Sequence, residues 1–109
     1  MNTENLYSEK AIEMAKLLLD KGVFDIDIVD VSKKTKMAKN LVIGTANSSE
    51  SAKEIALDFC EEIDKKGIEL YSCDGFNKGE WIVLDYDEVI IHIFTKSTRE
   101  KYNLEKLWR

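Results

Sequence analysis

The chain has 109 residues, no proline and a formal net charge of −5. Its hydrophobic content of 44% and charged content of 34% are typical of a soluble globular protein, and we expect one domain over residues 1–109. No apolar run reaches the roughly 18 residues of a membrane-spanning helix, and the first residues lack the basic start and apolar run of a secretion signal. We therefore expect a cytoplasmic protein that does not enter a membrane.

The charge balance and the cysteines argue against two kinds of site. The net charge is −5, and arginine occurs only at Arg99 and Arg109 against 14 lysines, which argues against direct wrapping of nucleic acid because that usually needs a basic face. The negative charge either favours docking onto a basic protein or serves solubility alone. Cys60 and Cys73 form no paired ligand motif, which predicts reduced thiols and no metal site.

The first predicted element is a helix. Thr3 can cap its beginning, and Gly22 can end it after about Lys21. Its apolar positions recur at helical spacing and are Ala11, Met14, Ala15, Leu18 and Leu19.

Two strands are predicted next, at residues 26–31 and 40–46. The second strand is continuously apolar, which indicates burial on both faces. Residues 32–39 lie between the strands and contain four lysines, so we expect a solvated connection there.

A second helix is predicted to begin at Asn47 or Ser48, with Glu50 placed to help cap it, and to stop at Gly67. Its stripe is the clearest amphipathic pattern in the chain and consists of Ala52, Ile55, Ala56, Phe59 and Ile63. Alternation then predicts a third strand at residues 68–73.

Residues 81–86 and 89–94 predict a β-hairpin that turns through Asp87 and Glu88. One side of this ribbon pairs Tyr86 with Val89, Leu84 with Ile91 and Ile82 with Ile93. The other side pairs Trp81 with Phe94, Val83 with His92 and Asp85 with Ile90. Since both sides are largely apolar, one side is expected to face helices and the other side needs a further cover.

Residues 97–100 read as a capping box that starts a short last helix, and Asn103 can end it. The order of elements predicts an α/β fold, namely a mixed sheet of about five strands with flanking helices.

Signals of catalysis are weak. His92 is the only histidine, and its place on a strand is more typical of a packed, hydrogen-bonded residue than of a catalytic base. The segment 44–49 leads from a strand into a helix, where backbone amides can hold a phosphate, but it lacks the spacing of a P-loop. Glu69 and Asp74 do not form the paired carboxylates that bind catalytic metal ions in nucleotidyltransferases.

Asp85 is unusual because it interrupts an otherwise apolar side of the hairpin. Burying a carboxylate is costly unless it is paired. It is expected either to accept a hydrogen bond from a turn or from Arg99, or to await a basic group of a partner beside Trp81.

These motifs resemble the ribosomal silencing factors, also called the Iojap family. The resemblance spans residues 11–108, and its most specific parts are Gly79 to Tyr86, Val89 to Phe94 and Arg99 to Trp108. Shorter matching parts are Asp30-Val31-Ser32 and Val42-Ile43-Gly44-Thr45.

The resemblance implies a nucleotidyltransferase-like core without catalytic carboxylates, no enzymatic activity and no cofactor. It implies binding to the large ribosomal subunit through ribosomal protein uL14, which sterically blocks the small subunit and represses translation under starvation or in stationary phase. The partner-binding residues implied are Trp81, Leu84, Asp85, Tyr86 and His92, with the Trp81 side of the hairpin as the docking side.

Other hypotheses stay open at this point. The chain is alternatively a homodimeric adaptor, a large-subunit biogenesis factor or a divergent nucleotidyltransferase. The family's hairpin usually turns through glycine where this chain has Asp87, and since aspartate tolerates left-handed geometry we expect the turn to persist.

Overall fold

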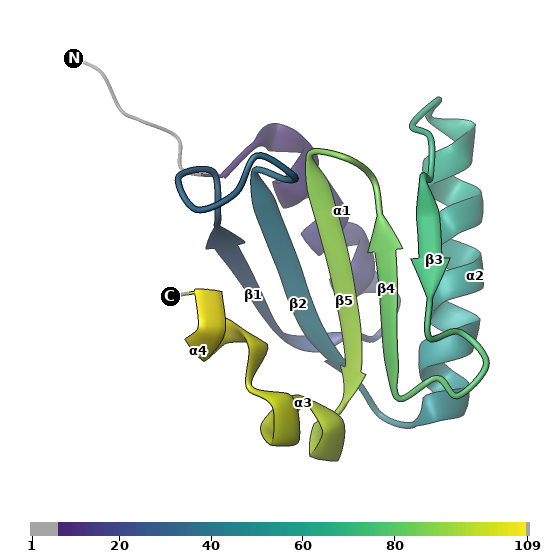
Figure 1. Cartoon of the computed structure of the whole chain (residues 1–109). Coiled ribbons are helices and arrows are strands. Elements are labelled where there is room, and N and C mark those ends of the chain that lie inside the picture. Colours follow the sequence, from purple (N-terminus) through teal and green to yellow (C-terminus); the bar gives the residue numbers. More distant parts are fainter. Residues whose placement is uncertain (1–6, 109) are drawn as a thin grey trace.

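The computed structural model describes residues 7–108, which form one mixed sheet with helices on both faces (Figure 1). The elements follow the order α1 (Glu9–Asp20), β1 (Phe24–Asp30), β2 (Asn40–Ala46), α2 (Ser49–Lys65), β3 (Ser72–Asp74), β4 (Trp81–Asp85), β5 (Val89–Thr95), α3 (Lys96–Tyr102) and α4 (Leu104–Trp108). The five strands lie in the spatial order β1-β2-β5-β4-β3. The predicted α/β class and mixed sheet are therefore confirmed.

Strand β2 lies beside β5 in the middle of the sheet, and these two strands are parallel. The pairs β1–β2, β4–β5 and β3–β4 are antiparallel. Every residue of β2 is buried, as its continuous apolar run predicts.

The two faces of the sheet are covered unequally. Helices α1 and α2 lie behind the sheet in Figure 1, and their apolar stripes pack against Val42, Ile82, Leu84, Ile91 and Ile93 in the larger core. A smaller core on the opposite face joins Val29, Leu41, Ile43 and Phe94 to Leu104 of α4. The short helices α3 and α4 leave much of β4 and β5 uncovered on that face (Figure 1).

Helix α2 begins where the sequence predicts, whereas α1 begins at Glu9, later than a cap at Thr3 implies. Ser8 caps α1, because its Oγ accepts a hydrogen bond from the Ala11 amide at 3.1 Å, whereas Thr3 lies outside the described residues. Ser48 caps α2 by accepting from the Ser51 amide at 3.0 Å. All five predicted stripe residues of α2 are buried, but Leu19 of the α1 stripe is 60% exposed.

Two boundaries were predicted wrongly. The strand expected at residues 68–73 is reduced to Ser72–Asp74, because its neighbour β4 ends at Asp85, opposite Ser72, and only the Tyr71 amide still donates to the Asp85 carbonyl, at 2.8 Å. Helix α3 begins at Lys96, directly after β5, so the capping box at residues 97–100 lies within the helix instead of at its start. Asn103 does end α3, in the left-handed conformation with φ 47°.

The hairpin has the predicted register. Trp81 lies opposite Phe94, Val83 opposite His92 and Leu84 opposite Ile91. The Tyr86 amide donates to the Val89 carbonyl at 2.9 Å across the turn. Asp87 has φ 74°, the left-handed geometry expected for it.

The turn predicts a rank order of stability for variants at Asp87. Asp87→Ala should lower the free energy of unfolding by about 1 kcal/mol, because a side chain with a Cβ and no local hydrogen-bonding group is strained at positive φ. Asp87→Gly should be at least as stable as the parent chain, because glycine adopts this geometry without strain. Urea unfolding would measure both values, and Glu88→Gly, at a position without positive φ, is the control that should lose stability.

Candidate functional site

The candidate site is the part of the sheet that α1 and α2 do not cover, which we call the open face. It consists of Trp81, Val83 and Asp85 of β4 with Ile90 and His92 of β5. Trp81, Val83, Asp85 and Ile90 are half-buried, whereas the residues that alternate with them on β4 are fully buried. Apolar side chains are therefore accessible in the middle of the molecule's least covered surface.

Trp81 is held in one orientation by its neighbours. Its ring stacks on Phe94, with centroids 4.9 Å apart, and lies against Tyr102 of α3 at 5.0 Å. Its indole Nε1–H donates to His92 Nδ1 at 3.0 Å. A half-exposed tryptophan that is already ordered loses little side-chain entropy on binding a partner.

His92 supports Trp81 and is poorly suited to catalysis. It is 8% exposed, and burial lowers the pKa of its imidazole to about 4. The neutral ring therefore accepts the Trp81 hydrogen bond at Nδ1 and carries its own proton on Nε2. This arrangement matches the packed, hydrogen-bonded strand histidine expected from the sequence.

Asp85 is explained locally by the hairpin turn. Its Oδ1 accepts a hydrogen bond from the Asp87 amide at 2.9 Å, which is the turn partner that was one of the alternatives. Arg99 instead donates to Thr45 Oγ1 at 2.8 Å and to Glu105 Oε2 at 2.5 Å. The half-buried carboxylate of Asp85 therefore both caps the turn and adds negative charge to the open face.

Leu84 and Tyr86 lie on the other side of the hairpin and do not line the open face. They are 0% and 2% exposed in the larger core. The Tyr86 hydroxyl donates to Cys60 Sγ at 3.3 Å, and burial raises the pKa of Tyr86. The prediction that Leu84 and Tyr86 contact a partner is therefore wrong, because α1, α2 and the sheet enclose both side chains.

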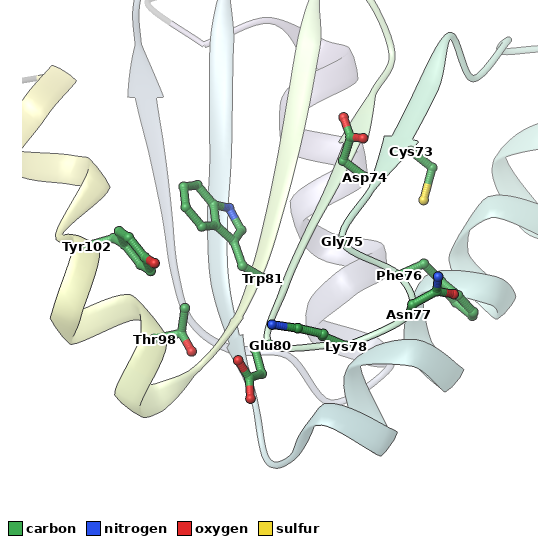
Figure 2. Close-up of a pocket in the computed structure, with 10 residues that line it drawn as sticks. All are labelled: Cys73, Asp74, Gly75, Phe76, Asn77, Lys78, Glu80, Trp81, Thr98 and Tyr102. Atoms are coloured by element: carbon green, nitrogen blue, oxygen red, sulfur yellow. The ribbon is translucent and has the colours of Figure 1, made fainter.

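A hollow of about 570 Å³ adjoins Trp81 at the lower end of the open face (Figure 2). Trp81, Thr98 and Tyr102 lie along one side of it, and the segment from Asp74 to Glu80 lies along the other (Figure 2). Because Asp74 pairs with Val83, its side chain belongs to the same face of the sheet as Asp85.

Sequence reasoning missed Asp74 as part of this surface. The predicted third strand ended before it, whereas the actual strand begins four residues later than predicted and includes it. No local sequence signal places Asp74 there, because its position follows from the pairing of Ser72–Asp74 with β4.

Two features considered as possible reaction centres have structural explanations or are not found. Among residues 7–108, no group of three or more His, Cys, Asp or Glu side chains is placed to hold a metal ion. The turn after β2 serves to cap α2 through Ser48. No helix in the same part of the chain is long and apolar enough to span a membrane.

Comparisons with known proteins point to one family. The family model described as "Ribosomal silencing factor during starvation" matches residues 4–109. Proteins named ribosomal silencing factor RsfS are 38% identical in Haemophilus influenzae, over 80% of this chain and 87% of that protein, and 34% identical in Bacillus subtilis, over 82% and 75%.

Solved structures show the same fold. A crystal structure of a protein from Chromobacterium violaceum superposes with a TM-score of 0.86 at 26% identity, covering 92% of this chain and 84% of that one. A protein from Bacillus halodurans gives 0.82 at 25% identity, covering 93% and 95%. Together, the match to the family model over nearly the whole chain, the curated relatives and the shared fold show that this chain belongs to the ribosomal silencing factor (RsfS) family.

Proposed function

We propose that this protein binds the large ribosomal subunit through its open face, contacts ribosomal protein uL14 there, and blocks the joining of the small subunit. Translation would then fall under starvation or in stationary phase. Membership of the ribosomal silencing factor family supports this proposal. The single observation that carries it in this chain is Trp81, half-buried and oriented by its neighbours on an uncovered sheet face.

The open face has the chemistry of a protein interface. Tryptophan is enriched among residues that contribute most to binding, especially where apolar neighbours exclude water around it. Val83 is such a neighbour on the same face, two residues from Trp81 along β4, and Ile90 extends the apolar surface toward the hairpin turn, opposite Asp85. The carboxylates of Asp74 and Asp85 border this apolar centre, and the chain's net charge of −5 gives a long-range attraction to a basic partner.

We propose that this role needs no catalysis and no cofactor. The only histidine in the chain is neutral and engaged through Nδ1 with Trp81. Inhibition by occlusion requires only that the bound protein fill space needed by the small subunit. An interface of about 800 Å² on each partner is the usual size for a specific complex of this kind.

Assembly of the large subunit is a second candidate role. The observation that favours it is a relative from Mus musculus named mitochondrial assembly of ribosomal large subunit protein 1. That protein is 24% identical over 87% of this chain, which spans 43% of the relative. Both roles use binding to the large subunit, so a direct binding test precedes any choice between them.

Binding to purified large subunits tests directly whether the open face contacts the large ribosomal subunit. Trp81→Ala should weaken binding at least tenfold in a cosedimentation assay, because truncating a buried interface anchor typically costs 2 kcal/mol or more. Val83→Glu should act similarly, because it places a charge in the apolar centre of the open face. Leu57→Glu is the matched control on α2, where Leu57 is 62% exposed.

Light scattering on the same proteins would detect self-association through the open face. Failure of the parent chain to bind large subunits would contradict the proposal. Equal binding by Val83→Glu and Leu57→Glu would contradict the assignment to the open face.

Asp85→Asn isolates the charge of Asp85 from its structural role. The amide oxygen can still accept the hydrogen bond from the Asp87 amide, so the turn should be retained. Binding to large subunits should weaken severalfold at low salt and depend less on salt concentration than in the parent chain. Asp85→Lys would be ambiguous, because lysine has no acceptor for the turn. Identical salt dependence in parent and Asp85→Asn would show that the charge does not meet a basic group.

The His92–Trp81 pair predicts a pH dependence of stability. The folded pKa of about 4 is below the ordinary value near 6.5, so the unfolded chain binds the proton more readily. The contribution of neutral His92 to the free energy of unfolding is therefore complete above about pH 6.5 and is lost as the pH falls toward 4. At 1.36 kcal/mol per pH unit, the total loss is about 3 kcal/mol. Urea unfolding between pH 7.5 and 4.5 would measure this loss.

His92→Gln is the reference for that measurement. It lacks the titrating ring, and the contributions of the carboxylates should cancel in the difference between the two proteins. If the difference in free energy of unfolding between the parent chain and His92→Gln does not change with pH, His92 titrates normally in the folded protein.

A further inference from the structure

Within residues 7–108, the outer edge of β1 has no strand beside it. This strand is seven residues long, occupies one end of the sheet and pairs only with β2 (Figure 1). Alternate residues of an edge strand direct their N–H and C=O groups away from the sheet, where another extended segment can pair with them. Edge β3 at the opposite end has only three residues, so β1 is the better template.

An apolar groove runs along this edge beneath α1. Its volume is about 380 Å³, and its lining is Ile12, Ala15, Lys16, Leu19, Ile26 and Ile28. Leu19 is 60% exposed even though it follows the helical stripe of α1. Leu19 therefore lines this groove instead of packing against the sheet.

The charges on β1 and in the groove indicate which kind of peptide segment this edge would bind. The straight part of β1 carries Asp27 on the face opposite the groove and Asp30, which pairs with Asn40, on the groove face, where Lys16 is the one basic residue of the lining. Hydrogen bonds from the Ser32 amide and hydroxyl hold the pKa of Asp30 below its usual range, so it is ionised at neutral pH.

We propose that the β1 edge binds an extended peptide segment that alternates apolar residues with lysine or arginine, as an added strand. The alternate apolar side chains of such a segment would enter the groove between α1 and β1. Its basic side chains would point to the opposite face, on which Asp27 lies because Asp27 pairs with Ile43 of the smaller core. This surface is separate from the open face around Trp81.

A second copy of the chain fits this edge less well. Pairing β1 with β1 of another copy would bring together two strands that each carry Asp27 and Asp30, and like charges on adjacent strands are destabilising. Nucleic acid is disfavoured for the same electrostatic reason. A basic strand gains both the apolar burial and the charge complementarity.

The added strand would be short. Asp25 has φ 51° and the β1–β2 register shifts between Phe24 and Asp27, so the straight part of the edge begins after this irregularity. The Asp25 carbonyl also accepts a hydrogen bond from Arg99 at 2.6 Å. Pairing is therefore confined to the part of β1 from Ile26 to Asp30.

A synthetic octapeptide of alternating lysine and valine provides the probe, added to the isotopically labelled full chain. Amide signals of Ile26 to Asp30 and methyl signals of Ile12 and Leu19 should shift together on binding. The same peptide with glutamate in place of lysine should bind at least tenfold more weakly. A lysine–valine peptide methylated at alternate amide nitrogens should also lose binding, because it keeps its charge but cannot pair as a strand.

Leu19→Lys and Leu57→Lys give a matched pair of variants. Both leucines lie on helices and are similarly exposed, at 60% and 62%, so the substitutions should leave thermal stability nearly unchanged. Leu19→Lys should weaken peptide binding at least tenfold, because it places a cation in the groove, whereas Leu57→Lys should not.

Three results would overturn the proposal. The first is the absence of peptide-induced shifts at β1, and the second is equal binding by the two lysine variants. The third is a concentration-dependent dimer, measured by light scattering, that Leu19→Lys abolishes, since this would assign the edge to a second copy. Large-subunit binding by Leu19→Lys should remain at the parent level, which separates this test from that of the open face.

Discussion

The parallel pairing of β2 with β5 is the constraint on which the rest of the structure depends. It runs from Asn40 opposite Val89 to Ala46 opposite Thr95 and joins two antiparallel pairs that are distant in sequence. One pair, β1 with β2, comes from the first half of the chain, and the other is the β4–β5 hairpin. Because both central strands are buried, a shift by one residue would turn Ile91 and Ile93 out of the larger core.

This register gives the two sides of the hairpin different roles. Ile82 and Leu84 face the long helix α2, which covers them completely. Trp81 and Val83 face the side where α3 and α4 are too short to reach across the sheet (Figure 1). An apolar surface of this kind would be a liability in a protein without a partner, so its presence agrees with the docking role that we propose.

Arg99 determines where the open face ends. Its guanidinium joins α3 to Thr45 of β2, to the Asp25 carbonyl of β1 and to Glu105 of α4. These bonds keep α3 and α4 over β1, β2 and the adjoining end of β5 and away from Val83. On the opposite face of β2, a Cβ at Gly44 would lie 2.3 Å from Val23 Cγ1, so the packing of β1 beneath α1 depends on the absence of a side chain there.

Local patterns in the sequence determined the helix stripes, the buried strand β2 and the pairing within the hairpin, because each depends on neighbouring residues or on a short turn. The resemblance to the family also pointed to Trp81. Only the tertiary structure decided that Leu84 and Tyr86 are core, that β3 is shortened and that Asp74 shares a face with Asp85. These features depend on which strand lies beside which and on how far each helix reaches, and long-range packing sets both.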